Sequence, residues 1–106
     1  MTVRYKNAKT DLTTTGATAV LTPANATTAV IKSILVSEDS GNADTITLTI
    51  TAGSDVFSLF KVKAVGANTT VELLTAPLVL AESEILKATA ATANRLHVVV
   101  SFMEIS

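Results

Sequence analysis

The chain has 106 residues, the length of one domain, with eight basic and nine acidic residues for a formal net charge of −1. It contains no cysteine, which excludes disulfides, thiolate nucleophiles and cysteine-ligated metals. Hydrophobic residues make up 48% of the chain and charged residues only 16%, against about 25% charged in typical soluble domains. The composition therefore predicts a folded domain whose surface is poor in charge.

The charge pattern argues against two classes of partner. Nucleic-acid binding needs a local excess of Lys and Arg to neutralise phosphates, whereas the basic residues here are scattered along the chain. No run approaches the ~20 apolar residues of a membrane helix. The chain also opens without the basic and apolar leader of a signal peptide, so we expect no secretory signal, no nucleic-acid partner and no membrane partner.

The sequence predicts ten short strands separated by turn residues, a spacing typical of a sandwich or barrel. In chain order they are Thr2–Tyr5, Lys9–Thr14, Ala17–Thr22, Thr28–Ser37, Thr45–Thr51, Val56–Val62, Thr70–Leu74, Leu78–Leu80, Ile85–Ala90 and Arg95–Ile105. We predict an all-β chain forming a single antiparallel β-sandwich over residues 1–106, with a jelly roll as one form it could take. Residues 1–9 are a candidate extended N-terminal arm.

The clearest strand is Thr45–Thr51, in which three apolar residues alternate strictly with four threonines. Period-2 alternation indicates a strand with one buried face. We expect Ile46, Leu48 and Ile50 to be buried in the core, against an alternating apolar face of the last strand or against other strands of the same domain. That second face consists of Leu96, Val98, Val100 and Phe102. The Gly53-Ser54 pair after Thr45–Thr51 predicts a two-residue hairpin.

Several predicted strands are apolar on both faces. Thr28–Ser37 places Val30, Ile34 and Val36 on one side and Ile31 and Leu35 on the other. In an isolated antiparallel sandwich one face of each strand normally meets water. A second apolar face, together with the low charge content, predicts that copies of the chain associate.

Only one histidine, His97, is available for acid–base or metal chemistry. Its neighbours on the same predicted strand face are Arg95, Val99 and Ser101, and Arg95 is expected to suppress protonation of the ring and to repel a metal ion. A catalytic or metal-binding histidine needs partners held by geometry. We therefore expect His97 to be a surface or interface residue.

The carboxylates fall in two clusters, each adjacent to turn residues. Glu38, Asp39 and Asp44 surround a Ser-Gly-Asn turn and lack the spacing of a calcium loop, so a solvated turn is expected. Glu82 and Glu84 are expected to solvate a loop, because a glycosidase pair needs a cleft lined with aromatic residues. Asn25 and Asn68 each begin a glycosylation pattern and are interpreted as turns. We predict no catalytic residues, no metal site and no cofactor.

The order of segments over roughly residues 20 to 106 resembles small β-sandwich proteins encoded among the virion genes of tailed bacteriophages. The segments that carry this likeness are Val30–Val36, the turn Ser37–Asn42, Thr45–Thr51, Ala67-Asn68, Pro77–Leu80, Leu96–Ser101 and Glu104-Ile105. Where such chains often have Gly-Asp after the segment equivalent to Pro77–Leu80, this chain has Ser83-Glu84, which leaves the shape of that turn open.

The resemblance implies a non-enzymatic structural component of a virion, assembled in the host cytoplasm. One implied role is a capsid decoration or cement protein that self-associates, with a trimer favoured, and binds the major capsid protein. Another is a neck, tail or fibre-attachment protein that binds other neck or tail proteins. A monomeric ligand-binding sandwich is a third possibility, against which the scarcity of aromatic residues argues.

Overall fold

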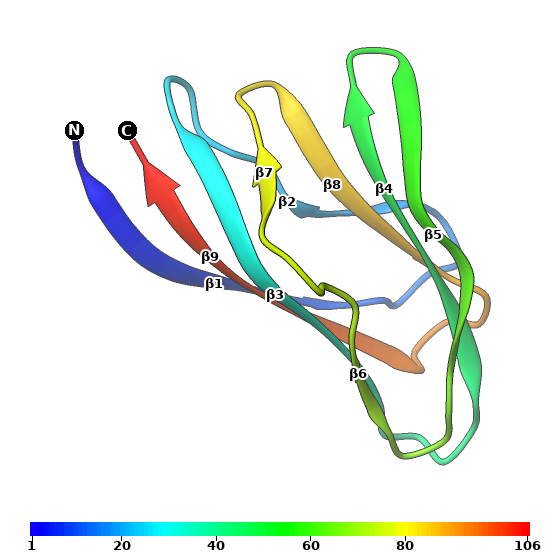
Figure 1. Ribbon diagram of the computed structural model, residues 1–106. Coiled ribbons are helices and arrows are strands. Elements are labelled where there is room, and N and C mark those ends of the chain that lie inside the picture. Colours follow the sequence, from blue (N-terminus) through cyan, green and yellow to red (C-terminus); the bar gives the residue numbers. More distant parts are fainter.

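The computed structural model describes residues 1–106 and consists of strands joined by turns (Figure 1). The nine strands are β1 (Val3–Asp11), β2 (Thr18–Leu21), β3 (Thr28–Glu38), β4 (Asp44–Ala52), β5 (Asp55–Val65), β6 (Thr70–Glu72), β7 (Leu78–Leu80), β8 (Glu84–Ala90) and β9 (Leu96–Ile105). No helix is present that is long and apolar enough to cross a bilayer.

The strands form two antiparallel sheets that pack face to face. One sheet has the order β1-β9-β3-β6, with β7 also pairing with β3, and the other has the order β2-β8-β4-β5. Pairing is nested: β4 pairs with β5, β3 with β6 and β7, β2 with β8, and β1 with β9. This is the arrangement of a jelly roll in which the edge strand that pairs with β3 is divided into two short strands, β6 and β7. The predicted all-β sandwich is confirmed.

The core lies between the sheets and is built from the alternating residues that the sequence indicates. Ile46, Leu48 and Ile50 of β4 are buried, and so is the apolar face of β9 on the opposite sheet. Both belong to one cluster of 20 buried residues. The alternation of Thr45–Thr51 therefore places its threonines on the outer face of the second sheet, where they are half-buried.

The turn between β4 and β5 is the predicted two-residue hairpin. Ala52 and Asp55 face each other across it, and Gly53 has a φ of +64°. A positive φ at the first of two central residues is the pattern of a type II′ turn, whose twist matches the flanking strands. The Gly53-Ser54 prediction is confirmed.

A bulge in β3 changes which of its residues face the core. The pairing of β3 with β9 shifts between Ile31 and Ser33, so that Lys32 is inserted. Ile31 is therefore buried together with Ile34 and Val36, whereas Val30 is half-buried and Leu35 is exposed. The predicted division of β3 into two faces is wrong for Val30 and Ile31, because it assumed unbroken period-2 alternation.

Strand β5 is an edge strand with two irregularities, and only Val65 at its end is buried. Val62 has a φ of +54°, and its N–H donates to Thr47 Oγ1 at 3.1 Å. Val56, Phe57 and Val62 are exposed. These irregularities blunt the edge of the second sheet.

The N-terminal residues lie in the first sheet. Thr2–Tyr5 and Lys9–Thr14, predicted as separate strands, belong to one strand, β1, that ends at Asp11 and pairs with β9 along its whole length. Residues 1–9 are thus extended but attached, and the two chain ends lie side by side (Figure 1), with Thr2 N donating to Ser106 O at 2.8 Å.

Candidate interaction surface

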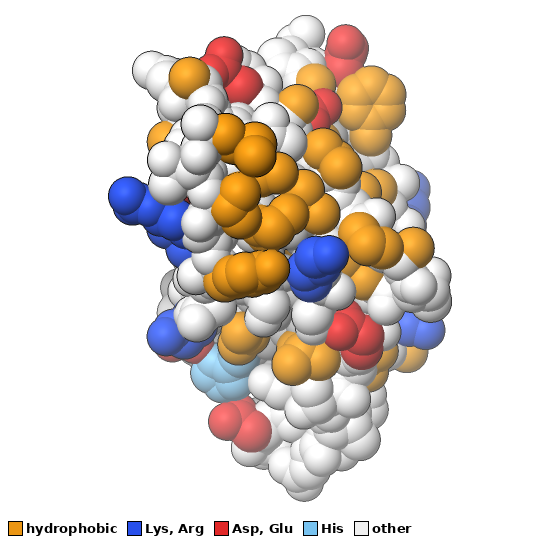
Figure 2. All heavy atoms as spheres, turned by 60° about the vertical axis from the view of Figure 1, so that its left-hand side comes forward, with side chains coloured by type: hydrophobic (Ala, Val, Ile, Leu, Met, Phe, Trp, Pro, Cys, Tyr) orange, Lys and Arg blue, Asp and Glu red, His pale blue; other side chains and the backbone are white.

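The outer face of the first sheet carries a row of apolar side chains that crosses four strands. In the strand register, Tyr5 of β1 faces Met103 of β9, Met103 faces Val30 of β3, and Val30 faces Val79 of β7. Tyr5 is 81% exposed and Val79 is 58% exposed. We call these four residues the apolar row. Figure 2, viewed from this side, shows apolar side chains gathered in the upper half of the molecule, above its single histidine.

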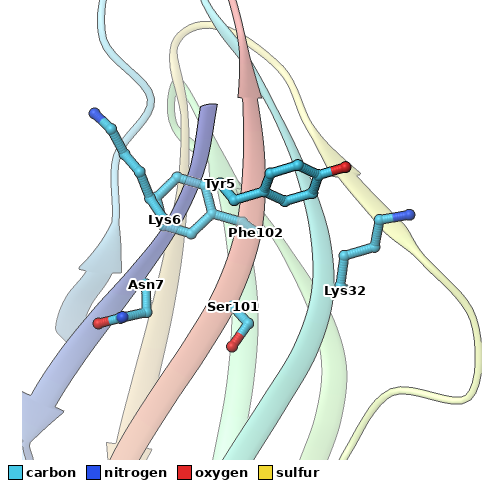
Figure 3. A pocket seen from close by; sticks show the side chains of 6 residues that line it. All are labelled: Tyr5, Lys6, Asn7, Lys32, Ser101 and Phe102. Carbon is cyan, nitrogen blue, oxygen red and sulfur yellow. The ribbon is translucent and has the colours of Figure 1, made fainter. Parts of the chain in front are cut away.

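A shallow hollow of about 390 Å³ lies beside the apolar row. Tyr5 leans from β1 across β9 toward β3, Lys32 stands on the far side, and Ser101 lies between them (Figure 3). Asn7 completes the side toward β1, while Lys6 points away over the sheet edge (Figure 3). The floor of the hollow is low because Ser101 and its cross-strand neighbour Ser33 have small side chains.

Two lysines without a carboxylate partner lie on the same sheet as the apolar row. Lys6 pairs with Glu104 at 3.3 Å, whereas Lys9 and Lys32 have no carboxylate within ion-pair distance. The carboxylate of Glu72, on the same sheet, binds the bulge of β3. It accepts a hydrogen bond from Ser33 Oγ and another from Ile34 N at 2.8 Å. An apolar surface with unpaired lysines beside it can bury a partner's apolar side chains and attract carboxylates around them.

Glu38 is the main buried charge of the molecule, with 1% of its surface exposed. Oε2 accepts from Ser40 N at 3.0 Å and from Ser40 Oγ. Oε1 accepts from Gly41 N and Asn42 N, each at 3.1 Å, and from Asn68 N at 3.3 Å. Burial alone raises the pKa of Glu38, but the hydrogen bonds from Ser40, Asn68 and Asn42 outweigh it and lower the pKa to about 2.

Glu38 therefore holds two turns together, and the predicted role of a solvated turn residue is wrong for it. Period-2 alternation continued from Ile34 and Val36 places Glu38 on the inner face, which is a signal that could have identified it. Asp39, by contrast, is exposed, and Asp44 is buried and accepts from Thr92 N at 3.1 Å.

His97 lies at the start of β9 on the same outer face, below the apolar row. Its Nδ1 contacts Asp11 Oδ1, and its Nε2 lies 3.1 Å from Asp39 Oδ1. The hydrogen bond with Asp11, opposed by burial and reinforced by Asp39, raises the pKa of His97. The expectation that Arg95 suppresses protonation is wrong, because Arg95 instead donates to Ala43 O at 3.1 Å. Both ring nitrogens face carboxylates, so neither is free to take a proton from a nucleophile.

The remaining predicted residues support turns. Glu82 accepts from Ala26 N, and Glu84 accepts from Ala81 N at 2.7 Å. Asn25 and Asn68 both lie in turns, and Asn68 has a φ of +54°. No group of three or more His, Asp and Glu side chains is arranged to hold a metal ion.

Comparison with known proteins yields no match, either to a protein-family model or to a curated protein.

Proposed function

We propose that this chain is a non-enzymatic structural component of a bacteriophage virion, and specifically a capsid decoration or cement protein that self-associates and binds the shell. The jelly roll supports this role because viral capsid domains are among its principal uses. Lectins and cupins share the fold, so the role is inferred from the surface of this chain as well as from its fold. The observation that carries it is the apolar row, which exposes aromatic and aliphatic side chains across four strands of a charge-poor protein.

The test is to purify particles from cells infected with a phage that encodes the chain, and then to image them. We expect the chain to co-purify with intact particles and to lie on the outer surface of the shell. Density at the neck or tail would replace the decoration role with that of a neck, tail or fibre-attachment protein. Absence of the chain from particles, with all of it in the soluble fraction, would overturn the virion proposal.

Self-association through the outer face predicts that Val79→Lys weakens assembly. Val79 is exposed and ends the apolar row, so a lysine there keeps the monomer folded but places a charge in the contact. We expect the dissociation constant between copies to rise about 10-fold or more, since a charge placed in an apolar contact costs on the order of 2 kcal/mol. Sedimentation velocity over a concentration series measures this change.

Val56→Lys is the matched control, because Val56 is a valine of similar exposure on the edge strand of the other sheet. It should leave the association constant unchanged. If Val56→Lys dissociates the protein and Val79→Lys does not, the contact lies along β5 and the assignment of the outer face is wrong.

A further inference from the structure

Three segments that are distant in sequence meet at His97. Asp11 ends β1, Asp39 follows the end of β3, and His97 lies between them near the start of β9, the strand that pairs with both β1 and β3. The register places Asp11 and Ser37 directly opposite His97 on its two sides. Each ring nitrogen contacts a different aspartate.

The chemistry of this arrangement requires a protonated ring. An ionised carboxylate only accepts hydrogen bonds, and a neutral imidazole has one donor nitrogen and one acceptor nitrogen. Both contacts can be hydrogen bonds at once only when both nitrogens carry hydrogen, that is, when His97 is an imidazolium. After the proton is lost, the lone pair of one nitrogen faces a carboxylate oxygen, so one contact becomes repulsive.

We propose that Asp11, His97 and Asp39 form a pH-responsive clasp: the imidazolium holds the end of β1 and the turn after β3 against β9, and loss of its proton releases one of them. The clasp lies at the lower end of the outer face (Figure 2), so its opening alters both the shape and the charge of that end. The proposal is independent of the virion role.

The other charged groups around the ring do not compensate for a lost proton. Lys9 lies two residue pairs further along β1, opposite Val99, and Arg95 donates to Ala43 O. On β3, Ser37 is neutral and Glu38 is buried within its own turn. The two aspartates therefore dominate the field at His97, consistent with its raised pKa.

Opening of the clasp is expected to be local. The chain beyond Asp11 remains attached because Leu12 N donates to Leu96 O at 3.0 Å and Leu12 is buried. The turn after β3 remains attached through Glu38. The pKa of His97 in the folded protein lies above the ordinary value of 6.5. The clasp therefore stabilises the folded state fully below pH 6.5. The contribution is lost as the pH rises through the folded pKa.

The first measurement is an NMR titration of His97, whose signal is unambiguous because it is the only histidine. We expect the wild-type pKa to lie above the ordinary value, and Asp11→Asn and Asp39→Asn each to lower it. Asp55→Asn, which removes an exposed carboxylate at the β4–β5 hairpin, is the control and should leave it unchanged. A wild-type pKa at or below the ordinary value, or one that neither aspartate variant lowers, would overturn the proposal.

The second measurement is amide hydrogen exchange in residues 10–11 and at residue 39, which lie outside the anchors at Leu12 and Glu38, corrected for the intrinsic dependence of exchange on pH. In the wild type, exchange in at least one segment should become several-fold faster as the pH passes the pKa of His97. In His97→Gln, which has no titrating ring, the same segments should show no such step. Titration of His97 without a change in exchange in either segment would reduce the clasp to a static ion pair and refute the switch.

Discussion

Replacing Leu48 by alanine should destabilise the fold more than any substitution on the outer face of the same strand. Leu48 is fully buried in the centre of β4 and packs in the cluster shared by the two sheets. Truncating such a leucine costs about 2–5 kcal/mol because the surroundings collapse only partly into the cavity. A domain has only about 5–15 kcal/mol of stability in total, so thermal unfolding should show a midpoint lower by roughly 10 °C or more.

Thr49→Ala is the control for Leu48→Ala, because Thr49 lies next to Leu48 in β4 and points to the other face. Its effect on the midpoint should be small. Thr47→Ala is a less suitable control, since Thr47 Oγ1 accepts the N–H of Val62 in the bulge of β5. Equal losses from Leu48→Ala and Thr49→Ala would show that inside and outside are wrongly assigned along β4.

The second large effect is expected from Glu38→Gln. The carboxylate accepts five hydrogen bonds through its two oxygens, all from donors in the two turns that it joins. Glutamine has one oxygen, and its amide group would point two hydrogens at N–H and O–H donors. At pH 7 we expect a midpoint lower by at least several degrees, together with faster amide exchange in residues 39–42 and 66–69.

The pH dependence of Glu38→Gln provides an independent check. The pKa of Glu38 falls from 4.5 to about 2 on folding, so its charge stabilises the native state above pH 4.5. This stabilisation is lost as the pH falls toward 2. The difference in midpoint between wild type and Glu38→Gln should therefore shrink with acidification. Glu104→Gln, which removes only a surface pair with Lys6, should change the midpoint little at any pH. A difference that stays constant from pH 7 to pH 2 would contradict the role of the charge.

Most of the fold could be predicted from the sequence because period-2 alternation and turn residues are local signals. They identify β4, β9 and the Gly53-Ser54 turn, and they set the core faces of both strands. These local signals fail where a strand is irregular. The bulge at Lys32 in β3 and the bulges of β5 depend on the register with the partner strand. The register of two strands is a tertiary property that alternation alone does not encode.

The outer face could be predicted only in part. Second apolar faces were visible in the sequence, but the apolar row joins Tyr5 with Val79, which become neighbours on one surface only through the nested pairing of the jelly roll. The contacts of His97 depend on the same nesting, because Asp11 is 86 residues away and Asp39 is 58 residues away. Neighbours in sequence suggested Arg95 instead, whose side chain is directed elsewhere.

The most direct test of the central claim, that this protein works by binding copies of itself, is the mass of the purified wild-type chain in solution. Sedimentation velocity should reveal a multimer of the 11.0 kDa chain that persists at micromolar concentration. A sharp monomer boundary that does not change up to millimolar concentration would contradict the claim and favour a monomeric ligand-binding sandwich.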